Sequence, residues 1–327
     1  MGAFGLQTHI WNNNLKSILL LAGFPLLLIV LLFGLVAGWV GLVEPVSSLA
    51  DGLALVRAHM ARAWPFAFLG AAIWFAIAWL FHQKMIEAAV GAKGISRKDA
   101  PELYNLLENL CISRGVRTPK LAIIETDALN AFASGVSEAT YTVTLTRGLI
   151  ERLDKAELEA VLAHELTHIM NRDVRLLIVA VIFVGIFSFV GELVFRTFFR
   201  SGVRVGGHTR SRNGDSRGGG LLILLAVAAI VIAYALALVI RFALSQKREY
   251  LADAGAVELT RNPDAMIGAL EKISQRPEVE APPDVAQMMV ENRARFAGIF
   301  ATHPPIEKRI AALQEYAGGV RVGHVLD

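Results

Sequence analysis

The sequence has few charged residues and only one cysteine. Charged side chains make up 19% of its 327 residues, against about 25% in an average soluble domain, whereas 54% are apolar. This balance excludes an intrinsically disordered chain and argues against an entirely soluble protein. The single thiol, Cys111, excludes an internal disulfide bond and a Cys-x-x-Cys metal site, and it suits a reducing compartment.

Net positive charge is confined to one short segment. The net charge is only +3, and arginines concentrate in the Gly/Arg/Ser-rich residues 200–220, which we expect to form a loop. No basic face runs along the rest of the chain to follow a phosphate backbone. We therefore expect no nucleic acid among the partners.

Four apolar segments have the length, or nearly the length, of a helix that crosses about 30 Å of hydrocarbon. They are residues 17–43, 63–80, 176–191 and 218–240. The third is the shortest and is followed by Glu192 and Arg196, which we expect to pair at i,i+4 spacing on one helix face. The first lacks a convincing cleavage site and is expected to be retained, with the lipid bilayer as a partner.

These segments divide the chain into four parts. We expect an N-terminal transmembrane hairpin (1–81), a soluble part with a sheet (82–173), a second hydrophobic hairpin (174–244) and a helical soluble part (245–327). Strand signals cover residues 120–125, 130–133 and 140–146. The expected fold class is mainly α with a small antiparallel β-sheet and about four transmembrane helices.

Helix starts are also visible in the soluble parts. An Asp followed three residues later by a Glu predicts N-caps at Asp99 and Asp154. Asn262 before a proline predicts another helix start, and residues 304–317 have the pattern of a final amphipathic helix.

Residues 164–168, His-Glu-Leu-Thr-His, form an H-E-x-x-H motif on the helix that Asp154 is expected to cap. Side chains four residues apart project from one helix face, so His164 and His168 can both ligate one zinc ion. Glu165 is rotated by about 100° and can reach water that the metal activates without taking a coordination position. The motif predicts a zinc site with Glu165 as the catalytic general base.

A third zinc ligand must come from elsewhere, and Glu192 and Glu249 are the candidates. Asp253 lies one helical turn after Glu249 and could accept the far N–H of a ligating histidine, which fixes its tautomer. Arg196 holds the equivalent position after Glu192 and offers no acceptor. This difference favours Glu249 as the ligand.

One zinc ion shared by His168 and Glu249 constrains the membrane topology. Arg175 and Leu244 must lie on the same side of the bilayer, so the segments between them form a hairpin that is either spanning or re-entrant. Basic residues that flank the first hairpin favour a cytoplasmic catalytic domain, whereas the arginines of 200–220 oppose the positive-inside rule if the second hairpin spans.

The motifs resemble those of the HtpX-type membrane zinc metalloproteases, relatives of the type I CaaX prenyl proteases. The matching residues are 130–135 (N-A-F-A-S-G), 164–173 (H-E-L-T-H-I-M-N-R-D), 249–253 (E-Y-L-A-D) and 302–309 (T-H-P-P-I-E-K-R). The resemblance covers most of the chain. It implies a gluzincin-like fold, one Zn²⁺ per chain, and endoproteolysis of membrane proteins without nucleotide, in stress-related quality control at the bacterial inner membrane.

The resemblance also implies roles for further residues. His303, which by position could equally cap a helix or face solvent, becomes a catalytic donor to the oxyanion, and Arg309 supports the site. The strand Asn130, Ala131, Phe132 and Ala133 would receive substrate by strand addition, although it could be an ordinary sheet edge. Alternative functions are a CaaX-type processing peptidase and a non-proteolytic zinc-binding membrane scaffold.

Overall fold

The structure is a computed structural model that describes residues 6–196, 217–243, 246–275, 289 and 304–318. The chain divides into two compact units. Unit 1 takes in Met1–Lys16, Leu80–Val179 and Phe242–Asp327, and unit 2 takes in Ser17–Trp79 and Ala180–Arg241.

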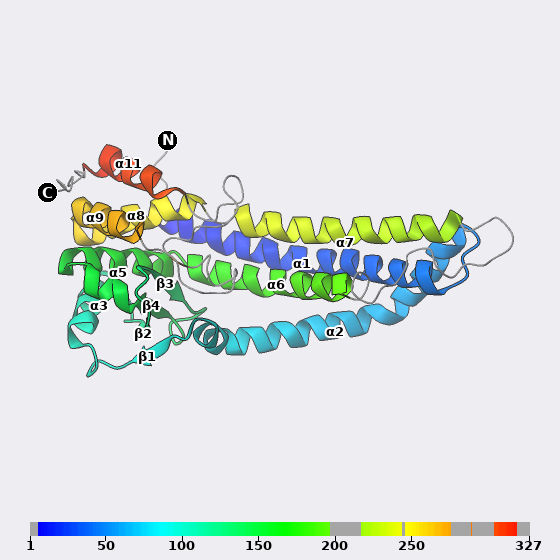
Figure 1. The fold of residues 1–327 in the computed structure, drawn as a ribbon, viewed down its shortest axis with the longest axis horizontal. Helices are drawn as coiled ribbons and strands as arrows, with labels where there is room; N and C mark the ends of the chain where they lie inside the picture. Colours follow the sequence, from blue (N-terminus) through cyan, green and yellow to red (C-terminus); the bar gives the residue numbers. More distant parts are fainter. Residues whose placement is uncertain (1–5, 197–216, 244–245, 276–288, 290–303, 319–327) are drawn as a thin grey trace. The chain divides into compact units, whose positions relative to one another are not determined.

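Unit 1 contains a four-stranded sheet (Figure 1). Its strands are β1 (Lys93–Ile95), β2 (Lys120–Ile124), β3 (Ala131–Ser134) and β4 (Thr142–Thr146), in the order β1-β2-β4-β3. The expected antiparallel sheet is in fact mixed, because β2 and β4 pair in parallel while the other two pairings are antiparallel. The chain passes from β2 through the edge strand β3 and returns antiparallel into β4, which therefore has the direction of β2.

Six of the described helices lie wholly within unit 1, among them α5, which carries the H-E-x-x-H motif. They are α3 (Pro101–Arg114), α4 (Arg147–Arg152), α5 (Lys155–Met170), α8 (Gln246–Thr260), α9 (Pro263–Ile273) and α11 (Ile306–Ala317). Helix α5 contacts β3 and β4 of the sheet and also packs against α3, α8 and α9 (Figure 1). Its apolar positions are buried, so the motif is held inside the protein core.

The cap predicted for α5 is confirmed. Asp154 accepts a hydrogen bond from the main-chain N–H of Glu157 (2.9 Å), whose carboxylate accepts from the N–H of Asp154 (2.8 Å). The cap predicted at Asp99 is wrong. Asp99 instead accepts from the N–H and hydroxyl of Ser96, and α3 begins later, at Pro101, a residue well suited to the first helical turn.

Helices α5 and α8 approach each other closely at Gly255. A Cβ atom at this position would lie 2.4 Å from Cγ2 of Thr167 on α5. Ala252 and Ala256, which flank this contact on α8, are fully buried. Small residues therefore allow α8, which carries Glu249, to lie directly against the motif helix.

Four long apolar helices supply most of unit 2. They are α1 (Leu6–Val43), α2 (Leu49–Val90), α6 (Asp173–Phe195) and α7 (Arg217–Ala243). All four have the length and composition to cross a membrane. Arg196, directly after the end of α6, donates to Glu192 at 2.6 Å, so the ion pair predicted from their spacing is confirmed.

The expected loop 200–220 is partly helical. Residues 200–216 lie outside the described residues, but α7 begins at Arg217 and includes the glycines that follow. A Cβ on Gly41 of α1 would lie 3.0 Å from the carbonyl oxygen of Gly219. The two helices pack backbone to backbone here, which explains how a glycine-rich segment forms part of a helix.

Candidate active site

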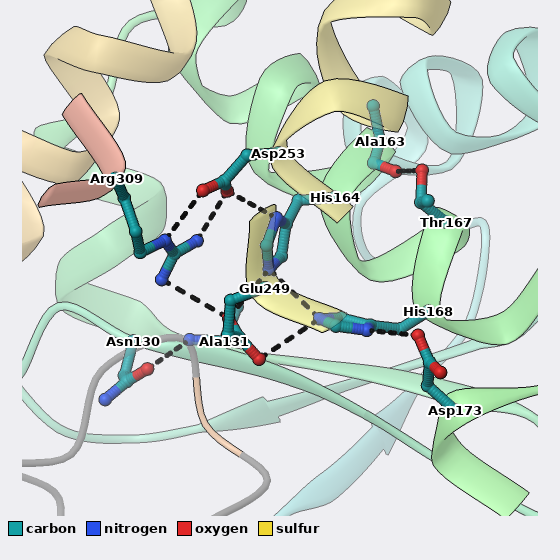
Figure 2. A network of polar contacts seen from close by, with 10 residues as sticks. All are labelled: Asn130, Ala131, Ala163, His164, Thr167, His168, Asp173, Glu249, Asp253 and Arg309. Carbon is teal, nitrogen blue, oxygen red and sulfur yellow. Dashed lines mark hydrogen bonds and ion pairs between the residues drawn. The ribbon is translucent and has the colours of Figure 1, made fainter. Parts of the chain in front are cut away.

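Helix α5 contributes two histidines to the site. The Nε2 atoms of His164 and His168 face each other at 3.2 Å, as expected for residues four apart on one helix face. From α8, the carboxylate of Glu249 lies 3.6 Å from each of these nitrogens (Figure 2). Each of these three side chains offers one ligand atom, and the three atoms lie within 4.8 Å of one another.

Each histidine also turns its second ring nitrogen to a carboxylate. His164 Nδ1 lies 3.0 Å from Asp253 Oδ1, and His168 Nδ1 lies 3.1 Å from Asp173 Oδ2 (Figure 2). A carboxylate at Nδ1 favours the proton there and leaves the Nε2 lone pair for a metal. The contact between Asp253 and His164 was expected from the sequence. The contact of Asp173 was not.

The arrangement fits a divalent metal ion. Two imidazole lone pairs and a carboxylate converge on one point inside the protein, where three electron-rich groups repel one another unless a cation lies between them. Donor atoms of a tetrahedral zinc ion with bonds of about 2.0 Å are about 3.3 Å apart, close to the observed separations. Two nitrogens and one oxygen are also a usual ligand set of catalytic zinc.

The electrostatic environment of His164 is dominated by its acidic neighbours. Burial lowers the pKa of His164, but the carboxylates of Asp253 and Glu249 outweigh this effect and raise the pKa to about 9. A zinc ion must therefore displace a proton from this site at neutral pH.

Arg309 of α11 closes the site on the side of α8. Its side chain is fully buried and donates to both carboxylate oxygens of Asp253, at 2.8 and 2.6 Å. Burial opposes ionisation of Asp253, but the Arg309 guanidinium holds the pKa of this carboxyl below its usual range. Arg309 also lies 3.4 Å from Glu249 and so contacts the carboxylates of both residues (Figure 2).

Glu165 is placed between the motif helix and the edge strand. It is buried, and its carboxylate accepts a hydrogen bond from the main-chain N–H of Ala133. Burial raises the pKa of Glu165, while the imidazoles of His164 and His168 oppose this rise. A carboxyl group with a raised pKa beside a metal site can both accept and return a proton.

The outer edge of β3 directs two main-chain N–H groups away from β4. That of Ala133 donates to Glu165, and that of Ala131 donates to the side-chain oxygen of Asn130 at 3.0 Å (Figure 2). Residues two apart on a strand point their N–H groups to the same side, which is here the side of the motif helix. The strand therefore lies beside the catalytic residues.

The structure thus brings together most of the residues that the sequence singled out. Helices α5, α8 and α11 contribute the motif, Glu249, Asp253 and Arg309, and β3 lies beside Glu165. His303 lies outside the described residues. Asp173 was missed, although it ends the quoted motif 164–173, because only the turn after α5 shows that its carboxylate folds back on His168.

Fold, site and apolar helices together define a membrane-integral metallopeptidase. The chain belongs to peptidase family M48, whose family model matches residues 97–317. It is 45% identical over 323 residues to a Protease HtpX homolog from Bacteroides fragilis, which covers 95% of this chain and 99% of that protein. A Protease HtpX homolog from Ligilactobacillus salivarius is 34% identical over 313 residues, with 94% and 99% covered.

These relatives confirm the resemblance found in the motifs, and the chain is an HtpX-type metalloprotease by family. Among solved structures, the crystal structure of Ste24p from S. mikatae is similar with a TM-score of 0.42 and 18% sequence identity. That alignment covers 93% of this chain and 66% of the other.

Proposed function

We propose that this protein is a zinc-dependent endopeptidase of the bacterial inner membrane that cleaves misfolded or damaged membrane proteins, as part of a stress response. The observation that carries the proposal is the convergence of His164, His168 and Glu249 next to the buried Glu165. The described part of the chain supplies three ligands, which leaves one position of a tetrahedral metal for water or substrate, as in catalytic rather than structural zinc sites.

Glu165 and His303 have different roles in the proposed mechanism. When bound, zinc supplies a Lewis acid that polarises a carbonyl group and acidifies water. Glu165 takes the proton from the attacking water and passes it to the leaving amine, which its raised pKa assists. From its place in the motif at 302–309, we assign His303 as a hydrogen-bond donor to the oxyanion.

Substrate would bind along β3. This strand is paired with β4 on one side and lies at the end of the strand order, and an extended peptide can add to its other side. The N–H groups of Ala131 and Ala133 would then exchange their present partners for substrate carbonyl groups. In strand addition the substrate is bound mainly through main-chain hydrogen bonds rather than through its side chains. This mode of binding suits a protease that cleaves damaged proteins of varied sequence.

The catalytic domain would face the cytoplasm. Basic residues flank the first apolar hairpin on the side of the peptidase domain, Lys84 and Lys93 among them, in accordance with the positive-inside rule. The single cysteine, Cys111, is buried and unpaired, which is compatible with this compartment.

The proposal is tested with the purified full-length protein and an unfolded membrane protein as substrate. Wild type should degrade the substrate, a chelator should stop degradation, and added zinc should restore it. Glu165→Gln preserves size and helix propensity but removes the base, so it should retain zinc and lose at least about 100-fold in rate. Near-normal turnover by this variant would contradict the mechanism.

A further inference from the structure

Asp173 is the first residue of α6, yet its side chain belongs to the site of α5. Its side chain is buried, with 4% of its surface exposed, and Oδ2 lies 3.1 Å from Nδ1 of His168. The Nε2 atom of the same ring faces His164 and Glu249. The His168 imidazole thus lies between the Asp173 carboxylate at Nδ1 and the two remaining metal-binding side chains at Nε2.

The turn that places Asp173 here is unusual. Arg172, between α5 and α6, has a φ of 59°, a left-handed conformation that residues with a side chain rarely adopt. This turn lets the chain leave α5 and begin α6 with Asp173 folded back on His168, only five residues earlier. A conformation that disfavours a side chain persists where the surrounding contacts hold it, and such positions gather at functional sites.

The main chain of Asp173 is fixed from a second direction. Arg248, which directly precedes Glu249 on α8, donates from its terminal nitrogen to the carbonyl oxygen of Asp173 at 3.3 Å. The Arg248 side chain is buried, with 8% of the residue exposed. Asp173 is therefore held against both helices that contribute metal ligands, α5 through its side chain and α8 through its main chain.

We infer that Asp173 is a positioning residue for metal binding, which orients the His168 imidazole and keeps its proton on Nδ1; this inference rests on the proposed zinc site. Asp253 makes the corresponding contact with His164 and is itself fixed by Arg309. The two ligating histidines are thus oriented by carboxylates from two different elements. A carboxylate behind a ligating imidazole fixes its direction and its tautomer, and its loss commonly weakens metal binding about 10–100-fold.

The test measures zinc affinity of the purified full-length protein by competition with a chelator. Asp173→Ala should weaken zinc binding about 10–100-fold, and Asp173→Asn, which retains an oxygen acceptor for Nδ1–H, should recover most of the loss. The visible spectrum of the cobalt-substituted protein should shift in Asp173→Ala, because the ligand field changes when His168 is free to rotate. Thermal melting of the zinc-free variants shows whether they are folded.

Arg172→Gly is the matched control, since it changes the same turn without removing the carboxylate. It should bind zinc within about twofold of wild type, because glycine adopts the left-handed conformation readily. Unchanged zinc affinity in Asp173→Ala, or an equal loss in Arg172→Gly, would overturn the inference. His164→Ala separates the two claims: if this variant binds zinc like wild type, the proposed zinc site itself is wrong.

Discussion

Gly255 offers a sharp test of how the packing of α8 sets the metal site. In Gly255→Ala the new Cβ would lie 2.4 Å from Cγ2 and 2.7 Å from Oγ1 of Thr167. Carbon atoms in contact are normally about 3.5–4.0 Å apart, so one helix must move by about 1 Å. Thr167 cannot simply rotate, because it is β-branched and its hydroxyl donates to the carbonyl of Ala163 at 2.8 Å.

The expected change in stability is opposite to the one that helix propensity alone predicts. Gly→Ala inside a helix normally stabilises a protein by about 1 kcal/mol, whereas overpacking a close contact costs about 1–3 kcal/mol. We expect Gly255→Ala to lower the free energy of unfolding by up to about 2 kcal/mol. A displacement of α8 by about 1 Å also exceeds the tolerance of about 0.2 Å in metal–ligand distances, so zinc affinity should fall at least about tenfold.

Thermal melting with and without zinc, together with zinc competition, measures both effects. Thr167→Ala removes the atoms that clash, so the double variant Gly255→Ala/Thr167→Ala should recover zinc affinity. Gly94→Ala, where a Cβ would meet nothing within 4 Å, is the control and should behave like wild type. Wild-type affinity in Gly255→Ala, or a failure of Thr167→Ala to restore it, would refute the argument.

The further predictions concern protonation, substrate binding and membrane topology. Since the raised pKa of His164 means that zinc competes with a proton, apparent zinc affinity should rise about tenfold per pH unit up to about 9 and then level off; a flat titration would contradict this. In the zinc-free protein the same group stabilises the fold fully below pH 6.5 and loses that contribution as the pH rises through about 9. Ala133→Pro removes one outward N–H of β3 and should raise KM or abolish cleavage with zinc retained; unchanged kinetics would place the substrate elsewhere. The topology is tested by replacing Ser211 or Ser137, an exposed residue, with cysteine in a Cys111→Ala background. In intact cells an impermeant maleimide should label the cysteine at 211 but not the one at 137, and after permeabilisation it should label both. Labelling at 137 in intact cells would refute a cytoplasmic active site.

Sequence patterns predicted those parts of the molecule that depend on local spacing. The motif helix and its Asp154 cap are one example, because helical periodicity and a capping box are both properties of a few neighbouring residues. The relation between Glu249 and Asp253 is another, since a spacing of four places both on one face of α8. In each case the structure contains the contact that the spacing indicates.

What the sequence did not reveal depends on tertiary packing or on rare backbone conformations. The left-handed Arg172, which directs Asp173 to His168, has no signal in a single sequence because most such positions are glycine. The parallel pairing of β2 and β4 depends on which side of β4 the strand β3 takes. At Asp99, a nearby Ser96 competes for the carboxylate, and the capping pattern fails.

The central claim is that one zinc ion is bound by His164, His168 and Glu249, and metal analysis of purified variants tests it most directly. Wild type should contain about one zinc per chain, and Glu249→Ala should lose zinc as severely as His164→Ala. Glu192→Ala is the matched control, because Glu192 of α6 pairs with Arg196, and it should retain zinc. Zinc retained in Glu249→Ala but lost in Glu192→Ala would contradict the account.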